Sequence, residues 1–144
     1  MLTVQKLAFL SRIELFSGMS SKELGHIAAI AEEIVYPART EIFREGDYGD
    51  YMLLVVEGEV KIHHGDKELM ICQKNDYFGE MTLLDGEPRS ASASTLTDCL
   101  MLRVNQANFH DILSGNFEAV LAIMRTLTQR LRKREEELWK LTRK

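Results

Sequence analysis

Hydrophobic side chains in the first 31 residues recur every three or four positions, which is the spacing of one face of an α-helix. The pattern predicts two helices, with buried faces of Val4, Leu7, Leu10 and Ile13 in the first and of Leu24, Ile27, Ala28 and Ala31 in the second. Phe16 and Gly18 interrupt the pattern between them. Ser20 and Glu23 have the spacing of a capping box, so we expect the second helix to begin at Ser20.

Between residues 32 and 104 the hydrophobic period becomes strand-like, and turn-forming residues separate short apolar runs. These runs lie at 34–36, 41–43, 51–56, 60–63, 69–72, 91–96 and 99–104. Gly65-Asp66 suits the two-residue turn of a hairpin. About eight short strands with frequent turns are typical of an antiparallel barrel or jelly roll. We therefore expect a mainly β fold, an antiparallel β-roll flanked by helices.

The chain returns to a helical pattern after residue 104. Asn105 and Asn116 are expected to cap two helices, and Gly115 to end the first of them. The final helix carries a heptad stripe made of Val120, Met124, Leu127, Leu131, Leu138 and Leu141. Arg134 interrupts this stripe. Two interpretations stay open, since the stripe can pack on the β-roll or pair with a second copy in a homodimer.

The composition is close to the average of soluble proteins, with 144 residues, 45% of them hydrophobic, and a net charge of -4. This length fits one domain, with N-terminal helices at 1–31, a β-roll at 32–104 and C-terminal helices at 105–144. The sequence has no run of 18 apolar residues and no leader pattern after Met1. We therefore expect a cytoplasmic protein with no membrane partner.

The charge is unevenly distributed along the chain. Residues 125–144 hold eight basic and three acidic residues, a net charge of +5, whereas residues 1–124 hold ten basic and 19 acidic residues, a net charge of -9. Nucleic-acid binding requires a basic face that neutralises phosphates. An acidic body with a basic tail lacks that face, and no helix-turn-helix segment follows, so we expect no nucleic-acid partner for this chain.

Cysteine and histidine are too sparse to suggest a metal site. Cys72 and Cys99 lie 27 residues apart with no further ligand at metal-binding spacing, so we expect buried thiols in strands. His63 and His64 are adjacent, and neighbouring residues of a strand point to opposite faces. The two imidazoles therefore cannot ligate one ion together.

The most informative segment is 78–91, which interrupts the strand pattern. Gly79 would let backbone amides approach an anion, and a short helix from Glu80 would add free N–H groups and the positive end of a helix dipole. Arg89 can bind two phosphate oxygens at once. A carboxylate at Glu80 would repel a phosphate but would accept a hydrogen bond from a sugar hydroxyl. These residues predict a site for a phosphate attached to a sugar.

Segment 78–91 resembles the phosphate-binding cassette of the cyclic nucleotide-binding domain family. The matching residues are Phe78-Gly79-Glu80, Leu83-Leu84 and Pro88-Arg89-Ser90-Ala91. The nine-residue step from Glu80 to Arg89 is similar to that of the regulatory subunits of cAMP-dependent protein kinase. Turns at 45–50 and 57–60 also match the family. The resemblance covers essentially the whole chain.

The resemblance implies that Glu80 accepts a hydrogen bond from the ribose 2′-hydroxyl and that Arg89 holds the equatorial phosphate oxygens. The further contacts that it implies are backbone amides near Gly79, Met81 and Thr82, the hydroxyl or amide of Ser90, and the side chains of Ile62 and Met70 along the sugar and base. The C-terminal helix would cover the base. Leu83 and Leu84 would connect the cassette to the C-terminal helices.

Selectivity for the base follows less directly from the resemblance. In the catabolite activator protein branch of the family, small hydroxyl residues of the C-terminal helix contact adenine, whereas Arg134 and Glu135 occupy that place here. Arg134 is therefore either a solvent-exposed charge or a contact to the base. Family members with threonine after the cassette arginine tend to favour cGMP, so Ser90 favours cAMP.

The expected function is a regulatory module that binds a cyclic nucleotide, either cAMP or cGMP, and transmits binding through the C-terminal helix to an output domain or partner. We expect no enzymatic activity, because the cassette holds no group that would activate water. The alternative is a dimerisation module that does not bind nucleotide and uses the heptad helix as its interface.

Overall fold

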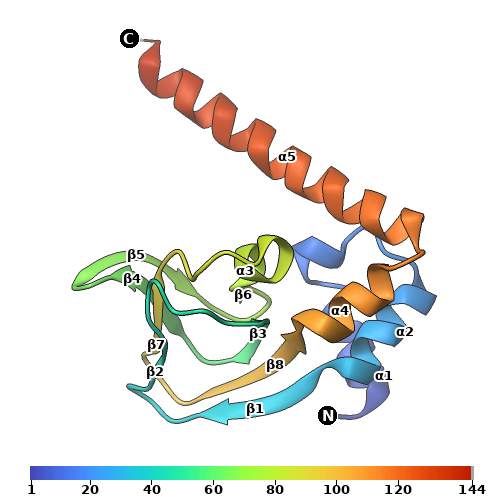
Figure 1. Cartoon of the computed structure of the whole chain (residues 1–144). Coiled ribbons are helices and arrows are strands. Elements are labelled where there is room, and N and C mark those ends of the chain that lie inside the picture. Colours follow the sequence, from blue (N-terminus) through green and yellow to red (C-terminus); the bar gives the residue numbers. More distant parts are fainter. Residues whose placement is uncertain (144) are drawn as a thin grey trace.

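The computed structural model describes residues 1–143 and contains two four-stranded sheets with helices at both ends of the chain (Figure 1). The helices are α1 (Thr3–Leu10), the 3-10 helix η1 (Glu14–Phe16), α2 (Ser21–Ile30), α3 (Glu80–Asp85), α4 (Gln106–Leu113) and α5 (Phe117–Thr142). The strands are β1 (Glu32–Tyr36), β2 (Glu41–Phe43), β3 (Tyr51–Glu57), β4 (Val60–His64), β5 (Lys67–Cys72), β6 (Tyr77–Phe78), β7 (Ser92–Thr95) and β8 (Cys99–Asn105). The expected antiparallel β-roll with flanking helices is confirmed.

The strand order is β1-β8-β3-β6 in one sheet and β2-β7-β4-β5 in the other, and all pairs are antiparallel. Strand β6 lies outside the predicted apolar runs, because two residues are too few to show an alternating pattern. It pairs with β3, placing Phe78 opposite Leu53 and Tyr77 opposite Leu54. This short edge strand fixes the start of segment 78–91 to β3.

Strand β3 separates two hydrophobic clusters, which explains its continuous apolar sequence. Met52, Leu54 and Val56 pack against the helices, with Leu102 and Val104 of β8 in the same cluster. The alternate side chains of β3, Leu53 and Val55, point into the roll. A strand covered on both faces needs apolar residues at every position.

The second helix confirms its predicted start. The Ser20 hydroxyl accepts a hydrogen bond from the Glu23 amide at 3.2 Å, and the Glu23 carboxylate accepts one from the Ser20 amide. The predicted face of the first helix is partly wrong. Val4 is exposed because α1 contacts the body mainly with its last turn, and Ile13 is buried after the helix has ended.

Helix α5 is packed in its first half and exposed in its second. Its buried residues are Ala119, Ala122, Ile123 and Thr126. A Cβ at Gly18 would lie 3.0 Å from the Ala122 Cβ, so this glycine permits the close approach of the chain to the helix. Of the predicted heptad stripe, Met124, Leu131, Leu138 and Leu141 are exposed. These four residues do not pack on the β-roll, although α5 passes above it (Figure 1).

The two adjacent histidines lie on opposite faces of β4, as expected. The buried His63 ring lies 2.9 Å from the Ser94 hydroxyl and 2.7 Å from the Gly65 carbonyl oxygen, whereas His64 is exposed beside Glu45. Residues 1–143 contain no cluster of three His, Cys, Asp or Glu side chains that could hold a metal ion. Over the same range no helix is long and apolar enough to cross a membrane.

Candidate functional site

The segment 78–91 leaves β6 and forms the predicted short helix. Gly79 precedes α3 with φ of 85°, a left-handed conformation that disfavours side chains with a Cβ. A Cβ at Gly79 would also lie only 2.7 Å from Nη1 of Arg89. Glycine is therefore required here both for the backbone angle and for the space that the guanidinium occupies.

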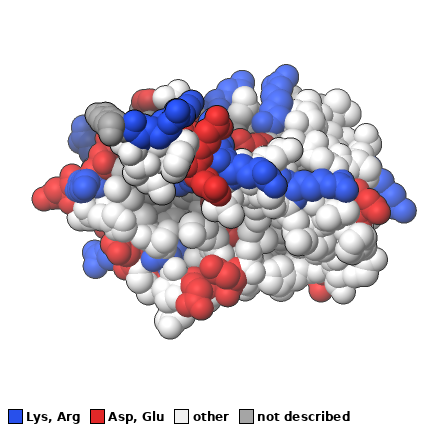
Figure 2. Space-filling view, turned by 90° about the horizontal axis from the view of Figure 1, so that it is seen from above, with Lys and Arg blue, Asp and Glu red and all other residues white. Residues whose placement is uncertain are grey.

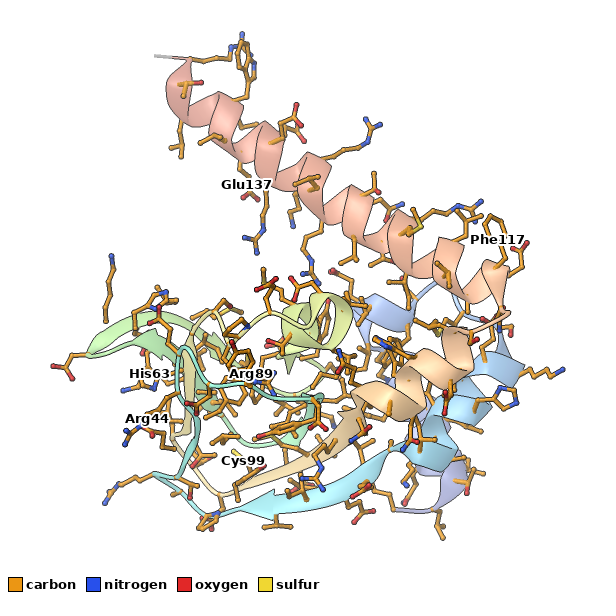
Figure 3. The ribbon with its side chains drawn as sticks, viewed as in Figure 1. Arg44, His63, Arg89, Cys99, Phe117 and Glu137 are labelled. Atoms are coloured by element: carbon orange, nitrogen blue, oxygen red, sulfur yellow. The ribbon has the colours of Figure 1, made fainter. Side chains whose placement is uncertain are left out.

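Arg89 lies inside the roll and is 3% exposed (Figure 3). Its Nη1 donates to the Gly79 carbonyl oxygen at 3.2 Å, and its Nη2 donates to the Tyr51 carbonyl oxygen at 2.7 Å. The guanidinium carbon lies 4.2 Å from the centre of the Phe43 ring and 4.7 Å from that of Tyr51. Two backbone acceptors and two aromatic rings thus fix the guanidinium in one place.

The loop between β2 and β3 holds the backbone around Arg89. The Arg89 amide donates to the Asp47 carbonyl oxygen at 2.8 Å, and the Gly46 amide donates to the Arg89 carbonyl oxygen at 2.9 Å. A Cβ at Gly49 would lie 2.5 Å from Nη2 and 2.6 Å from Nε of Arg89. A segment 40 residues away in sequence therefore shapes the space beside the guanidinium.

The electrostatic setting of Arg89 is unusual for a buried cation. Burial lowers the pKa of its guanidinium, while Tyr51, Asp50 and Asp47 raise it. Its Nε is buried without a hydrogen-bond partner within residues 1–143, and no acidic side chain of that range forms an ion pair with it. Buried arginines are almost always paired, so this one is poised to accept an anion.

Glu80 is the first residue of α3, and its side chain is 14% exposed. Burial raises the pKa of its carboxyl group, while its own backbone N–H, Arg134 and Arg89 lower it. Nη1 of Arg130 from α5 lies 3.1 Å from Oε1 of Glu80. The Glu80 carboxylate is therefore held by a side chain of another element, unlike Arg89.

Arg130 joins Glu80 to two further groups. Its guanidinium donates to the Tyr77 hydroxyl and lies 5.3 Å from the centre of the Tyr77 ring. Its Nε lies 3.7 Å from the carboxylate of Glu14 in η1. The arginine thus connects α5 with η1, β6 and α3.

A groove of about 970 Å³ separates α5 from the roll and the cassette. Met70, Tyr77 and Glu80 line it on the roll side, and Arg130, Arg134 and Glu137 line it on the α5 side. Figure 3 shows Glu137 on the face of α5 that overhangs the roll, with Arg89 deeper inside the roll. The groove is open to solvent and borders the Glu80 end of the cassette.

Comparisons with known proteins agree with this geometry. The family model described as "Cyclic nucleotide-binding domain" matches residues 33–116. The chain belongs to the cyclic nucleotide-binding domain family. A cyclic nucleotide-gated potassium channel of Rhizobium etli is 31% identical over 88% of this chain and 36% of the channel. A cAMP-dependent protein kinase regulatory subunit of Aspergillus niger is 35% identical over 74% of this chain and 26% of the subunit.

Solved structures show the same fold. The regulatory domain of Toxoplasma gondii PKA, in co-crystal with cAMP, aligns with a TM-score of 0.73 at 26% identity and covers 76% of this chain and 44% of that one. The chain spans about a third of the channel and about a quarter of the kinase subunit that it matches. This cyclic nucleotide-binding domain therefore corresponds to one part of those longer proteins.

The structure brings some predicted site residues together and separates others. Gly79, Glu80 and Arg89 lie at one end of the roll, close enough for Arg89 to lower the pKa of Glu80. Thr82 is buried and its carbonyl oxygen accepts a hydrogen bond from Gln106 of α4, whereas Met81 and Ser90 are exposed. The expected site thus has a fixed centre and an exposed rim.

The remaining predicted contacts lie on the hairpin and on α5. Ile62 is half-buried against the roll interior, and Met70 opposite it is exposed and lines the groove. Arg134 is exposed on α5 and also lines the groove, so it is both solvent-exposed and near Glu80. Leu83 is fully buried in the cluster that also contains Phe109 of α4 and Ile123 of α5, and its carbonyl oxygen accepts a hydrogen bond from Gln106 of α4.

Sequence reasoning did not identify Gly49, Phe43, Tyr51 or Arg130 as parts of the site. Gly49 lies within the turn at 45–50 that matches the family, which was the one available signal. The structure explains the glycine, because a Cβ there would collide with Arg89. Arg130 stands four residues before Arg134, on the same face of the helix. The aromatic pair carried no signal, because stacking on an arginine leaves no mark in strand periodicity.

Proposed function

We propose that this domain binds a cyclic nucleotide, with the cyclic phosphate at Arg89 and the ribose at Glu80. The observation that carries the proposal is the buried Arg89 guanidinium, whose Nε has no partner and whose charge has no counter-ion within residues 1–143. A phosphate oxygen would supply both. Charge-assisted hydrogen bonds of this kind contribute about 1.5–3 kcal/mol each.

The cassette backbone supports the same assignment. The left-handed Gly79 turns the chain so that α3 begins beside Arg89, and the first amides of a helix have no acceptor within the helix. In the proposal the amides of Gly79, Met81 and Thr82 and the hydroxyl or amide of Ser90 complete the phosphate site. The positive end of α3 and the Arg89 charge then act on the same anion.

Glu80 supplies the ribose end of the proposed site. Its carboxylate is mostly buried, and only acceptor sites are available on an ionised carboxylate. A 2′-hydroxyl can donate to it, whereas a phosphate would be repelled. In the proposal, Ile62 and Met70 line the sugar and base, and α5 with Arg134 covers the base from across the groove.

The comparisons support a regulatory and non-catalytic role. One relative is named a regulatory subunit of cAMP-dependent protein kinase, and one solved neighbour is a regulatory domain in co-crystal with cAMP. We therefore propose a cytoplasmic regulatory module that favours cAMP over cGMP and acts through α5. The signal would pass to an output domain that is attached to this domain or to a partner that binds it.

Isothermal titration of the chain with cAMP and with cGMP tests the proposal. We expect binding of both, tighter for cAMP, and no binding by Arg89→Leu at the same protein concentration. Arg89→Lys keeps the charge but loses the two-pronged geometry, so it should bind weakly while staying folded. Arg125→Leu is the control, because Arg125 is exposed on α5. A folded wild-type protein that binds neither nucleotide would contradict the proposal.

A dimerisation role is the second candidate function, and the exposed heptad residues favour it. Leu131, Leu138 and Leu141 of α5 are exposed, with Trp139 beside them. Apolar residues at heptad spacing can pair two helices. If α5 forms a homodimer interface, sedimentation should show a dimer without nucleotide that Leu131→Glu with Leu138→Glu converts to a monomer. A monomeric wild type in the presence and absence of nucleotide would exclude this role.

A further inference from the structure

Gln106 is the first residue of α4, and it is bonded to two separate segments of the candidate site. Its backbone amide donates to the Asp50 carbonyl oxygen at 2.6 Å. Its side chain is half-buried, and Nε2 donates to the carbonyl oxygens of Leu83 at 3.1 Å and of Thr82 at 3.4 Å. One residue therefore connects the loop between β2 and β3 with the cassette helix α3, which lies beside the start of α4 (Figure 1).

The loop side of this connection is the part of the chain that confines Arg89. Gly49, the residue before Asp50, leaves the space that the guanidinium occupies. Tyr51, the residue after Asp50, accepts a hydrogen bond from Arg89 through its carbonyl oxygen. The backbone bond from Gln106 is therefore made between two residues that position the guanidinium.

The cassette side of the connection is the C-terminal end of α3. The last carbonyl groups of a helix lack partners within it, and the Leu83 carbonyl oxygen finds two in α4. Besides Gln106, Nε2 of His110 lies 2.9 Å from it. A carbonyl oxygen only accepts hydrogen bonds, so this imidazole nitrogen is the donor. Two side chains four residues apart, on one face of α4, thus hold the end of α3 that lies opposite to Glu80.

These hydrogen bonds fix the direction of α3. The buried Leu83 side chain anchors the helix, but apolar contacts have no preferred direction, whereas hydrogen bonds do. Helix α3 has six residues, so a bond that orients its last turn also orients its first. Arg130 contacts only the carboxylate of Glu80, whereas Gln106 orients the backbone that carries Glu80.

We propose that Gln106, assisted by His110, is a positioning residue that sets the separation between Arg89 and Glu80. The inference rests on the proposed nucleotide site and adds to it a residue outside the expected ligand contacts. In a cyclic nucleotide the phosphate is fused to the ribose, so its distance from the 2′-hydroxyl is fixed. Both ends of the ligand can be bound at once only if Arg89 and Glu80 keep the matching separation, which a preformed connection provides.

The effect of Gln106 should appear in selectivity as well as in affinity. Viewed from the side of α5, Lys and Arg side chains form a line across the molecule (Figure 2). Such charges attract every nucleotide anion alike. The 2′-hydroxyl contributes only where the Glu80 carboxylate reaches it. The ratio of the affinities for cAMP and for its 2′-deoxy analogue therefore reports the separation, and the surface charges leave this ratio unchanged.

Titration calorimetry with cAMP and the 2′-deoxy analogue tests the proposal in Gln106→Met, which keeps the length, charge and helix propensity of the side chain but has no donor. The affinity for cAMP should fall about three- to tenfold. The preference for cAMP over the analogue should fall from about tenfold to about threefold or less. His110→Phe removes the second donor from an exposed residue and should shift both values the same way, by less. Gln73→Met makes the same substitution at an exposed position and should change neither.

A merely structural role of Gln106 gives a different result. It would lower the fraction of folded protein and weaken the binding of both nucleotides by the same factor. An equal fall for the two nucleotides, or unchanged affinities, would therefore overturn the proposal. If Gln106→Met does not fold, His110→Phe decides, and an unchanged preference in that variant would be the contrary result.

A measurement without nucleotide separates this inference from the proposed function. The Gly86 amide donates to the Thr82 carbonyl oxygen at 2.9 Å at the end of α3, and its hydrogen exchange reports how firmly this end is held. Exchange should be about threefold faster or more in Gln106→Met and unchanged in Gln73→Met. If neither cAMP nor cGMP binds the wild type, the proposed function fails, while the exchange rates still decide whether Gln106 holds α3. If cAMP binds the wild type and exchange in Gln106→Met is unchanged, the proposed function stands and the positioning role is refuted.

Discussion

The two ends of the cassette are held in different ways. At the Arg89 end, the guanidinium is bonded to the Gly79 and Tyr51 carbonyl oxygens and stacked on two rings, so the β-roll itself positions it. At the Glu80 end, the carboxylate is held by Arg130, a long side chain from a helix that is only partly packed. The comparison separates a preformed half of the site from an adjustable half.

The two ends differ because their partners differ in mobility. A backbone carbonyl of β3 cannot move without disturbing a strand that is buried on both faces. A side-chain partner can leave by rotating its own bonds. In a ligand-gated module, the rigid half can provide affinity, while the adjustable half can convert binding into movement, since only a group with two positions can report the ligand.

Apart from replacement of Arg89 itself, the largest effect is expected from Gly49→Ala at the rigid end. The added Cβ would lie 2.5 Å from Nη2 and 2.8 Å from the guanidinium carbon of Arg89, so the guanidinium must move. Loss of a charge-assisted contact of about 1.5–3 kcal/mol lowers affinity about ten- to hundredfold. Titration with cAMP should show this loss, while the free energy of unfolding falls by only about 1 kcal/mol, because the flexible arginine can adjust.

Gly25→Ala provides a matched control for that substitution. Gly25 lies in α2, where an added Cβ meets nothing within 4 Å. Alanine favours helices over glycine by about 0.8–1.0 kcal/mol, so stability should rise and affinity should stay the same. If Gly49→Ala binds cAMP as tightly as the wild type, the space beside Gly49 does not fix the position of the Arg89 guanidinium, and this end of the site is not rigid.

The cassette residues at both ends were more predictable from sequence than the residues that hold them. Gly79, Glu80 and Arg89 lie in one short segment, so their spacing carries the chemistry, and Ser20, Asn105 and Asn116 mark helix starts by local capping bonds. Residues that act over long sequence separations left no comparable pattern. Gly49 reaches Arg89 across 40 residues, and Arg130 reaches Glu80 across 50.

The sequence pattern also could not decide how α5 is used. Its heptad spacing is compatible with packing on the roll or on a second copy, because both interfaces select the same apolar residues. The structure shows that Ala119, Ala122 and Ile123 make the contact with the body, joined by Leu127 of the stripe. Alanine allows close approach but contributes little to a hydrophobic pattern. The stripe therefore pointed to larger side chains, most of which are exposed.

A substitution at the adjustable end should change the affinity for cAMP less. Titration of Glu80→Gln with cAMP and with its 2′-deoxy analogue tests this. The variant keeps the shape of the side chain but replaces a charged acceptor by a neutral one, so the affinity for cAMP should fall by about three- to tenfold. The variant also weakens the contact with Arg130, so the carboxamide is freer to turn toward the hydroxyl and part of this fall is offset. The net change in affinity should therefore be smaller than that of Gly49→Ala.

The analogue shows which end of the site is affected. In the wild type, removal of the 2′-hydroxyl should weaken binding about tenfold, because the Glu80 carboxylate then lacks its donor. In Glu80→Gln the two nucleotides should bind within about threefold of each other, whereas Arg89→Lys should weaken both alike, because it acts on the phosphate that they share. If the wild type and Glu80→Gln discriminate equally between the two nucleotides, the ribose hydroxyl does not bind Glu80.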